Sequence, residues 1–193
     1  DASPCDREPI GGRAILRVEP AQASDAAWIE RLLRAHWGSP RIVTRGRVHD
    51  ASALPAYVAR DGDQRVGLAT YRIDGSDCEL VSLNSERDGA GVGGTLLAAV
   101  AAAARSAGCK RLWLITTNDN LPALRFYQKR GFRLLRIHRD ALEASRRLKP
   151  SIPRSGACRT RISATGSPPT WRRLRRLISA PISSRMASTP VRV

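Results

Sequence analysis

A glycine-rich segment is the first part of the sequence that could do chemistry. It spans residues 88–95, with the sequence DGAGVGGT, between a predicted strand and a predicted helix. Glycines allow positive φ angles and a close approach of the backbone to a ligand. Successive N–H groups at the start of a helix attract phosphate oxygens. The segment therefore predicts a phosphate-binding loop with contacts from Gly89, Ala90, Gly91, Val92, Gly93 and Gly94.

Two known phosphate-binding motifs and a plain turn compete as interpretations of this loop. A Walker P-loop needs a lysine directly before Thr95, where the sequence has Gly94. Gly89, Gly91 and Gly94 fit the dinucleotide pattern G-x-G-x-x-G. That fold, however, expects the strand to run directly into the first glycine, whereas residues 85–88 intervene here after an antiparallel half. A tight turn without a ligand remains the simple alternative.

A second pattern follows in the next predicted helix, Asn-x-x-Ala-x-x-Phe-Tyr-x-Lys-x-Gly-Phe, from Asn120 to Phe132. Together with Gly91-Val92-Gly93, it resembles the GNAT superfamily of N-acetyltransferases. The acetyl-CoA signature of that family is Gln/Arg-x-x-Gly-x-Gly/Ala at a strand-to-helix turn. The motifs cover residues 78–137, and the order of predicted elements extends the resemblance over most of residues 13–153.

The loop departs from the family signature at two positions. Asp88 occupies the Gln/Arg position, and Ala90 lies where many members carry a basic residue. A carboxylate near a pyrophosphate replaces a charge-assisted contact. We therefore expect weakened CoA binding rather than its loss, because Arg87 is adjacent.

The resemblance implies direct transfer of an acetyl group from acetyl-CoA, as co-substrate, to a primary amine. In this family the strand before the loop splays from its neighbour, and its backbone pairs with the pantetheine arm. Matched by distance from the glycines, that stretch is Val81, Ser82 and Leu83. A backbone N–H there would polarise the acetyl carbonyl. The resemblance requires no metal.

The resemblance also offers candidates for proton transfer. An amine with a pKa near ~10 is mostly protonated at pH 7, so a base or a water chain must remove a proton. Glu79, on the strand that enters the site, is the candidate base. The alternative interpretation is a solvent-facing strand residue without a catalytic role. Tyr127 matches the general acid of the family, or else is a core aromatic. Asn120 would cap its helix and contact the cofactor, or would be a cap alone.

The three histidines, His36, His49 and His138, lack metal-ligand spacing, so no metal site is predicted. In this family the region around His49-Asp50 often helps to form the acceptor side. We interpret this pair as polar loop residues rather than catalytic ones. The sequence also has no Gly-x-Ser-x-Gly motif or Cys/His nucleophile arrangement, in agreement with direct transfer.

Hydrophobic patterns predict the elements that would position these residues. The first half reads as a helix followed by an antiparallel meander, and the continuous apolar run 111–117 indicates a central buried strand. The fold class is therefore α/β (α+β), with a mixed, mostly antiparallel central sheet flanked by helices. The predicted strands are residues 13–18, 57–59, 66–71, 78–83, 111–117 and 131–137, and the predicted helices are 24–37, the segment from the glycine-rich loop to about 107, 121–130 and 140–148.

The 193-residue chain has a net charge of +16, which is unevenly distributed along the sequence. Residues 154–193 contain nine Arg and no acidic residue, whereas the first 153 residues contain 24 basic and 17 acidic residues. We therefore predict a flexible segment 1–12, a GNAT-like domain 13–153 and a basic Arg/Ser/Pro-rich tail 154–193.

The tail has two interpretations. Family members usually finish with another strand, and here the sequence changes character instead. The tail is either a basic appendage for nucleic acid or an acidic partner, or a disordered, out-of-frame extension from a frameshift, which we favour. Cys158 to Ala164 is the stretch that could supply the missing strand.

Cysteine usage and the lack of long apolar runs predict a cytoplasmic protein. The four cysteines are far apart and form no C-x-x-C motif, which is typical of reduced packing residues. No signal peptide and no membrane-spanning segment are predicted. We expect a monomer or homodimer with a small-molecule or protein amine as acceptor, and neither nucleic acid nor a membrane as partner. A degenerate CoA sensor and a basic nucleic-acid-binding protein without catalysis are the alternatives.

Overall fold

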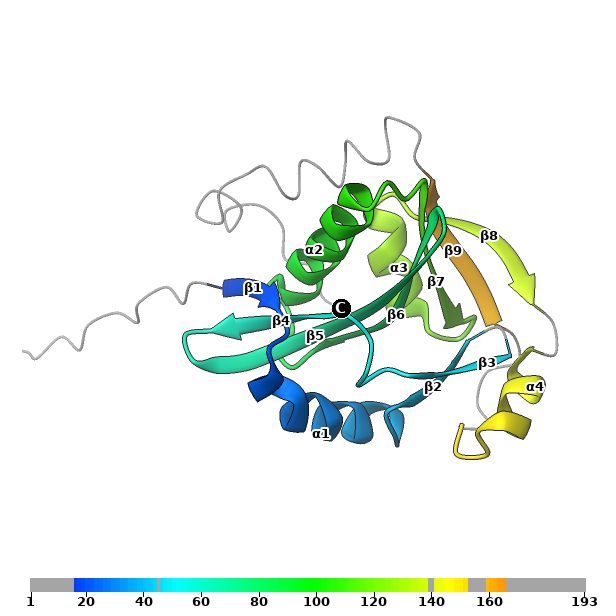
Figure 1. The fold of residues 1–193 in the computed structure, drawn as a ribbon. Helices are drawn as coiled ribbons and strands as arrows, with labels where there is room; N and C mark the ends of the chain where they lie inside the picture. The colour runs from blue at the N-terminus through cyan, green and yellow to red at the C-terminus, as the bar shows by residue number, and fades with distance from the viewer. Residues whose placement is uncertain (1–15, 45, 139–140, 153–158, 166–193) are drawn as a thin grey trace, which may run out of the picture.

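A seven-stranded sheet forms the centre of the protein (Figure 1). The computed structural model describes residues 16–44, 46–138, 141–152 and 159–165. All neighbouring strands of this sheet are antiparallel except β6 and β7, which are parallel. The predicted fold class is confirmed. In spatial order the strands are β1 (Leu16–Pro20), β4 (Ala56–Asp61), β5 (Gln64–Asp74), β6 (Asp77–Ser85), β7 (Arg111–Thr117), β9 (Arg159–Thr165) and β8 (Arg133–His138).

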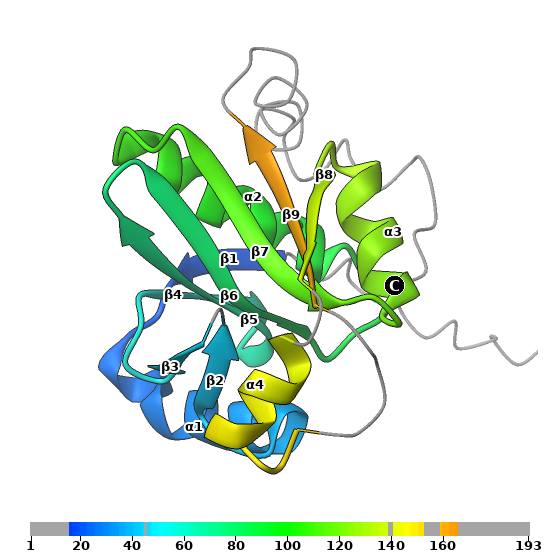
Figure 2. The same ribbon diagram turned by 90° about the vertical axis from the view of Figure 1, so that its right-hand side faces the viewer.

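Helices cover both faces of the sheet (Figures 1 and 2). Helices α2 (Val92–Ser106) and α3 (Leu121–Lys129) lie on one face. The other face carries α1 (Ala26–Trp37), α4 (Ala141–Leu148) and a separate hairpin formed by β2 (Arg41–Thr44) and β3 (Arg47–Asp50). The buried apolar side chains accordingly form two clusters, one under α2 and α3 and one under α1 and β2.

The predicted elements between residues 57 and 148 are confirmed, whereas the β2–β3 hairpin is a finding of the structure. We predict a loop for this region from the sequence, because strands of only four residues leave too short a pattern to be recognised. The first described strand, β1, overlaps the predicted strand 13–18, of which residues 13–15 lie outside the described part of the chain. Residues 1–12, for which we predicted flexibility, lie outside the described part of the chain.

The start of α1 is anchored by Asp25, its N-cap residue, whose side chain makes no capping hydrogen bond to the helix. A short 3-10 turn, Ala23–Asp25, precedes α1. The fully buried Asp25 carboxylate accepts the Gln22 N–H at 2.9 Å and pairs with Arg60 and Arg65 at 2.6 Å each. Burial would raise the pKa of Asp25, but these hydrogen bonds and charges outweigh it and lower the pKa. Asp25 thus anchors the start of α1 to β4 and β5.

Gly67 on β5 sets the position of α2. A Cβ atom at this residue would lie 2.5 Å from Val92 Cγ1 and 2.9 Å from the carbonyl oxygen of Asn84. Real Cβ atoms do not approach other atoms so closely, so only glycine permits this contact. The first turn of α2, which follows the glycine-rich loop, is therefore seated directly on the sheet.

The predicted domain boundary at residue 153 is corrected by β9. This strand pairs with β7 from Arg111–Thr165 to Thr117–Arg159, and β8 pairs with its other edge. Ile162 of β9 is fully buried in the cluster under α2. The first part of the predicted tail is thus an internal strand of the sheet, at the stretch considered above for the missing strand. Residues 166–193 lie outside the described part of the chain.

Candidate active site

The strands β6 and β7 form a fork that opens toward the glycine-rich loop. Their pairing runs only from Asp77–Arg111 to Glu79–Trp113, although β6 continues to Ser85. A register shift in the β5–β6 pairing adds one residue, Val81, to β6 at this point. Backbone groups on the β7 side of residues 81–83 therefore have no partner in β7, as the resemblance implied.

The side chains of the three predicted pantetheine-binding residues are used in packing. Val81 lies in the cluster under α1, and Leu83 packs against the cluster under α2. The Ser82 hydroxyl lies 2.7 Å from the Thr70 hydroxyl in a buried hydrogen bond. What this part of the fork offers a ligand is therefore its backbone.

The glycine-rich loop lies at the open end of the fork. Gly89 and Gly91 have φ angles of 72° and 78°, a left-handed conformation that glycine adopts without strain. Gly91 is the N-cap of α2 and has no side chain that could accept the first-turn N–H groups, such as those of Val92 and Gly93. A Cβ at Gly89 or Gly91 would meet no described atom within 4 Å, so space for a ligand lies in front of the loop. We call residues 89–94 the cradle.

Arg130, a residue that sequence analysis missed, lies against the cradle. A Cβ at Gly94 would be 3.1 Å from Arg130 Nη2. The guanidinium stacks over the Phe126 ring at 3.6 Å and donates to the Phe126 carbonyl at 3.0 Å. Its Nε is buried without a hydrogen-bond partner in the described structure. Burial lowers the pKa of Arg130, and the positive end of the α2 dipole lies beside it. A bound anion would offset both the burial of the Arg130 charge and its repulsion by the helix dipole.

Arg87 does not compensate for Asp88 in this conformation. Its guanidinium pairs with Asp61 and donates to Gln64 Oε1 at 2.9 Å. The side chain is therefore directed toward the β4–β5 turn.

Tyr127 and Asn120 occupy the two ends of α3. Tyr127 is 7% exposed and packs against Phe126 and Phe132. Burial raises the pKa of its phenol well above the ordinary value, against the opposing charge of Arg130. Asn120 accepts the Ala123 N–H at 3.2 Å through its side chain. The predicted cap is confirmed, and its contact with a cofactor stays a prediction.

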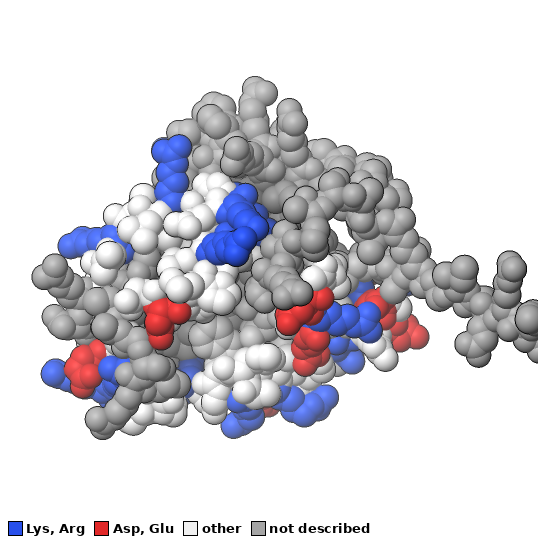
Figure 3. Space-filling view, turned by 180° about the vertical axis from the view of Figure 1, so that it is seen from behind, with Lys and Arg blue, Asp and Glu red and all other residues white. Residues whose placement is uncertain are grey.

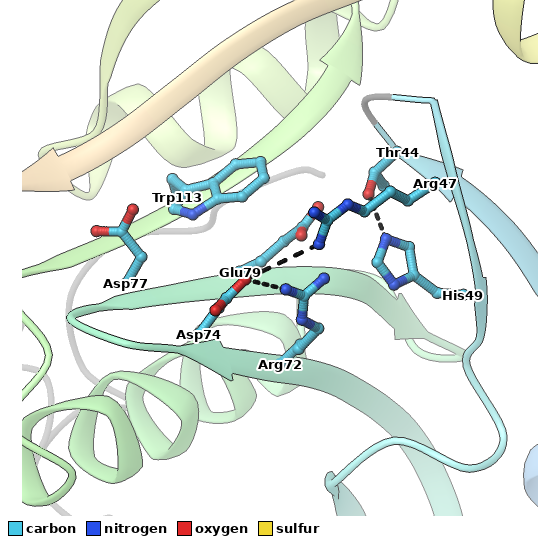
Figure 4. A pocket seen from close by; sticks show the side chains of 8 residues that line it. All are labelled: Thr44, Arg47, His49, Arg72, Asp74, Asp77, Glu79 and Trp113. Atoms are coloured by element: carbon cyan, nitrogen blue, oxygen red, sulfur yellow. Dashed lines mark hydrogen bonds and ion pairs between the residues drawn. The ribbon is translucent and has the colours of Figure 1, made fainter.

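A polar pocket of ≈ 440 Å³ lies at the closed end of the fork, between the sheet and the β2–β3 hairpin (Figure 4). Glu79 and Trp113, the last β6–β7 pair before the fork opens, both line it. Glu79 is 6% exposed, so it is not the solvent-facing strand residue of the alternative interpretation. We call this site the hairpin pocket; its lining residues are Thr44, Arg47, His49, Arg72, Asp74, Asp77, Glu79 and Trp113.

His49 was interpreted as a polar loop residue, and the structure places it on β3 in this pocket. Its Nε2 lies 2.7 Å from the Thr44 hydroxyl, and the residue is 8% exposed. Burial lowers the pKa of His49, and the charges of Arg72 and Arg47 lower it further. The imidazole is therefore neutral at pH 7 and able to accept a proton. The sequence did not place His49 in a pocket because the hairpin that positions it was not predicted.

Ion pairs organise the charges of the hairpin pocket. Arg72 pairs with Asp74, and the Arg47 guanidinium lies 4.0 Å from the same carboxylate (Figure 4). Asp77 pairs with Arg111, whose Nε donates at 3.0 Å. Cys78, which lies between Asp77 and Glu79, is fully buried, and burial raises the pKa of its thiol to about 12, so the thiol is protonated at neutral pH.

Comparison with known proteins agrees with this geometry. Residues 16–132 match the model of the acetyltransferase (GNAT) family. The chain belongs to the GNAT acetyltransferase family. It is 41% identical to the uncharacterized protein YxbD of Bacillus subtilis (strain 168) over 126 residues, which are 65% of this chain and 79% of that protein. It is 42% identical to YdhI of the same organism over 119 residues, which are 61% and 74% of the two chains.

Solved structures share the fold of this GNAT chain. The crystal structure of a Bacillus subtilis acetyltransferase in complex with CoA superimposes with a TM-score of 0.57 at 17% identity, over 78% of this chain and 99% of that chain. In the described part of this chain, no helix is long and apolar enough to cross a membrane. The described residues also contain no group of three His, Cys, Asp or Glu side chains that could hold a metal ion.

Proposed function

We propose that the protein transfers an acetyl group from acetyl-CoA directly to a primary amine. The observation that carries this proposal is the fork, with the backbone cradle at its open end and the hairpin pocket at its closed end. A pantetheine arm that enters from the cradle would bring the thioester toward the last β6–β7 pair. An amine in the hairpin pocket would approach the thioester from the opposite side.

The cradle and its surroundings fit the phosphates of CoA. The amides of residues 89–94 and the positive end of α2 would bind the pyrophosphate. Arg130 would supply the positive charge that the family signature places at the position of Asp88. The backbone of Val81, Ser82 and Leu83 would pair with the pantetheine arm, and Asn120 lies where the resemblance implies a further contact. The CoA complex of the B. subtilis acetyltransferase with the same fold supports this assignment.

Acetyl-CoA supplies an activated thioester, and the residues of the fork would act on its reaction with the amine. The amine nitrogen bonds to the acetyl carbon, the C–S bond breaks, and the sulfur leaves with the bonding electron pair. A backbone N–H of residues 81–83 would stabilise the negative charge that develops on the carbonyl oxygen. The proton lost by the amine passes to a base in the hairpin pocket.

Tyr127 is suited to stabilise the departing thiolate. Because burial raises the pKa of its phenol, the hydroxyl stays protonated at neutral pH and can donate a hydrogen bond. The same high pKa opposes full transfer of the proton to sulfur. We therefore assign Tyr127 as a hydrogen-bond donor to the thiolate, with the proton itself coming from solvent.

Glu79 remains our candidate for the base, and the structure adds His49 as a second. Both line the hairpin pocket. Substituting Glu79→Gln and His49→Gln separately tests the assignment, since the base should account for about 10²–10⁴-fold in kcat. The other variant should lose much less.

Two alternatives without catalysis receive less support. A CoA sensor would keep the cradle but would not need a polar pocket at the closed end of the fork. For a nucleic-acid-binding protein we would expect a continuous basic surface, and in Figure 3 acidic side chains are interspersed with basic ones on the face in view. We retain a cytoplasmic location as part of the proposal, supported by the buried free thiols of Cys78 and Cys109.

Release of free CoA thiol from acetyl-CoA, measured against a panel of amines, tests the proposal. We expect amine-dependent thiol release, and we expect acetyl-CoA to raise the melting temperature by mass action. Stabilisation by acetyl-CoA without thiol release for any amine would favour the sensor. If acetyl-CoA causes neither thiol release nor stabilisation, both the proposed activity and the proposed cofactor are contradicted.

A further inference from the structure

We infer that the acceptor is a small amine that also carries a carboxylate, and that Arg47 and Arg72 bind this carboxylate in the hairpin pocket. This inference rests on the proposed function, because it names the acceptor of the same transferase. The fold alone does not determine an acceptor, so the argument comes from the side chains of the pocket.

The first observation is an excess of positive charge at the hairpin side of the pocket. Two guanidiniums, from Arg47 on β3 and Arg72 on β5, approach the single carboxylate of Asp74. The other aspartate of the pocket, Asp77, pairs with Arg111 and does not neutralise them. The cluster of Arg47, Arg72 and Asp74 therefore carries one net positive charge.

The second observation is that this positive charge acts inside the pocket. Arg72 and Arg47 both lower the pKa of His49, which lines the same pocket. The Arg72 side chain is only 26% exposed, so its charge is partly shielded from solvent. An anionic group between the two guanidiniums would gain charge-assisted hydrogen bonds. The planar guanidinium of arginine, with its parallel N–H groups, matches the geometry of a carboxylate.

The third observation concerns size and charge balance. A pocket of ≈ 440 Å³ lies in the range of small-molecule sites. Glu79 also lines the pocket, so the excess positive charge belongs to the cluster of Arg47, Arg72 and Asp74, and the lining as a whole is balanced. An acceptor with one carboxylate and one ammonium group keeps this balance, whereas a phosphate monoester, at about −1.5 to −2, does not. The amine of the acceptor would point to the last β6–β7 pair, and its carboxylate would lie toward the hairpin. This arrangement fits an amino acid better than a polyamine, which has no anionic group.

Paired acceptors test the inference. We would measure kcat/KM for 4-aminobutyrate, butylamine, a phosphorylated amine and a polyamine with the full chain. We expect 4-aminobutyrate to exceed butylamine by about tenfold or more, because butylamine lacks only the carboxylate. Arg72→Gln should bring this ratio close to one, mainly through a higher KM for 4-aminobutyrate. The control Arg34→Gln, an exposed residue on α1, should leave the ratio unchanged.

Asp74→Asn provides a test with the opposite sign. It removes the carboxylate that competes for both guanidiniums, so the KM for 4-aminobutyrate should fall several-fold. A higher KM in this variant, or equal selectivity in wild type and Arg72→Gln, would overturn the inference.

The inference can fail while the proposed function holds. If butylamine or the polyamine is the better acceptor, the transferase activity stands and the carboxylate site is wrong. Preference for the phosphorylated amine would identify phosphate as the anion and also overturn the proposed class. If acetyl-CoA binds but no amine is acetylated, calorimetric titration of 4-aminobutyrate in the presence of CoA tests the carboxylate site directly. Absence of 4-aminobutyrate binding in this titration contradicts the inference. Absence of acetyl-CoA binding contradicts the proposed function itself.

Discussion

The two ends of the β6–β7 fork are made of different chemical groups. The cradle presents mainly backbone amides, together with Arg130, whereas the hairpin pocket presents side chains from β2, β3, β5, β6 and β7. Backbone amides can bind phosphate whichever side chains flank them, so we expect the cradle to bind CoA despite Asp88. A pocket made of side chains depends on each residue, and its ligand must be derived from those residues. The two ends should therefore respond separately to substitution.

The largest expected effect comes from a change that removes the support of both ends. Deletion of residues 154–193 removes β9, which pairs with β7 over its whole length and buries Ile162 in the core. We expect the truncated protein to lose its cooperative thermal transition. A 1–153 protein that unfolds cooperatively and binds acetyl-CoA would contradict the place of β9 in the fold.

The matched deletion leaves β9 in place. A protein that ends at Thr165 should keep its affinity for acetyl-CoA within about tenfold, roughly 1.4 kcal/mol. Titration calorimetry with acetyl-CoA measures this effect. A larger loss would show that residues 166–193 contribute to the cofactor site.

Gly91→Glu should disable the cradle end alone. A carboxylate and a side chain would occupy the space in front of the loop, so we expect acetyl-CoA affinity to fall by more than about 100-fold, or 2.7 kcal/mol. The control Gly108→Glu carries the same positive-φ strain at the other end of α2, where φ is 73°. Thermal shifts with acetyl-CoA compare the two, and an equal shift in both variants would place the pyrophosphate elsewhere.

Tyr127→Phe should affect the chemical step between the two ends. The ring and its packing against Phe126 and Phe132 stay, and only the hydroxyl is lost. Because the hydrogen bond to the thiolate forms mainly in the transition state, kcat should fall by about 100-fold with little change in acetyl-CoA affinity. Single-turnover kinetics isolate the chemical step. A loss below about threefold there would remove Tyr127 from the mechanism.

The smallest expected effect is a pH dependence that belongs to the hairpin pocket. The pKa of His49 is lower in the folded protein than its ordinary value near ~6.5. Below that pH the unfolded state binds more protons, so the contribution of His49 to stability is lost as the pH falls, at about 1.4 kcal/mol per unit of pKa difference.

Denaturant unfolding at pH 7.5 and 5.5 measures this contribution. His49→Gln should lessen the loss of stability at the lower pH, whereas His36→Gln, at an exposed position on α1, should not. If His49→Gln loses as much stability between pH 7.5 and 5.5 as the wild type, the imidazole does not titrate as its surroundings indicate.

The cradle end could be predicted from the sequence, and the hairpin pocket could not. Glycines such as Gly91 and the helix that begins after them are local features, so their spacing is readable along the chain. His49, Arg72 and Trp113 meet only because a short, unpredicted hairpin crosses the sheet. Arg130 was missed for a similar reason, since its contact with Gly94 depends on how α3 packs on α2.

The end of the domain shows the same limit of sequence analysis. Residues 159–165 have the composition of a basic tail, and only their pairing with β7 and β8 makes them a strand. Gly67 likewise reads as an ordinary strand residue until α2 is seen to press on it. Local patterns predicted elements, whereas long-range packing decided which residues share a site.

A crystal structure with bound CoA tests the central claim most directly. The account predicts that the pyrophosphate accepts hydrogen bonds from the amides of residues 89–94 and lies beside Arg130. It further predicts that the pantetheine arm runs between β6 and β7 along residues 81–83, with the sulfur within hydrogen-bonding reach of the Tyr127 hydroxyl and toward the Glu79–Trp113 pair. A CoA molecule bound outside the fork, or one whose sulfur is directed away from the hairpin pocket, would contradict the account.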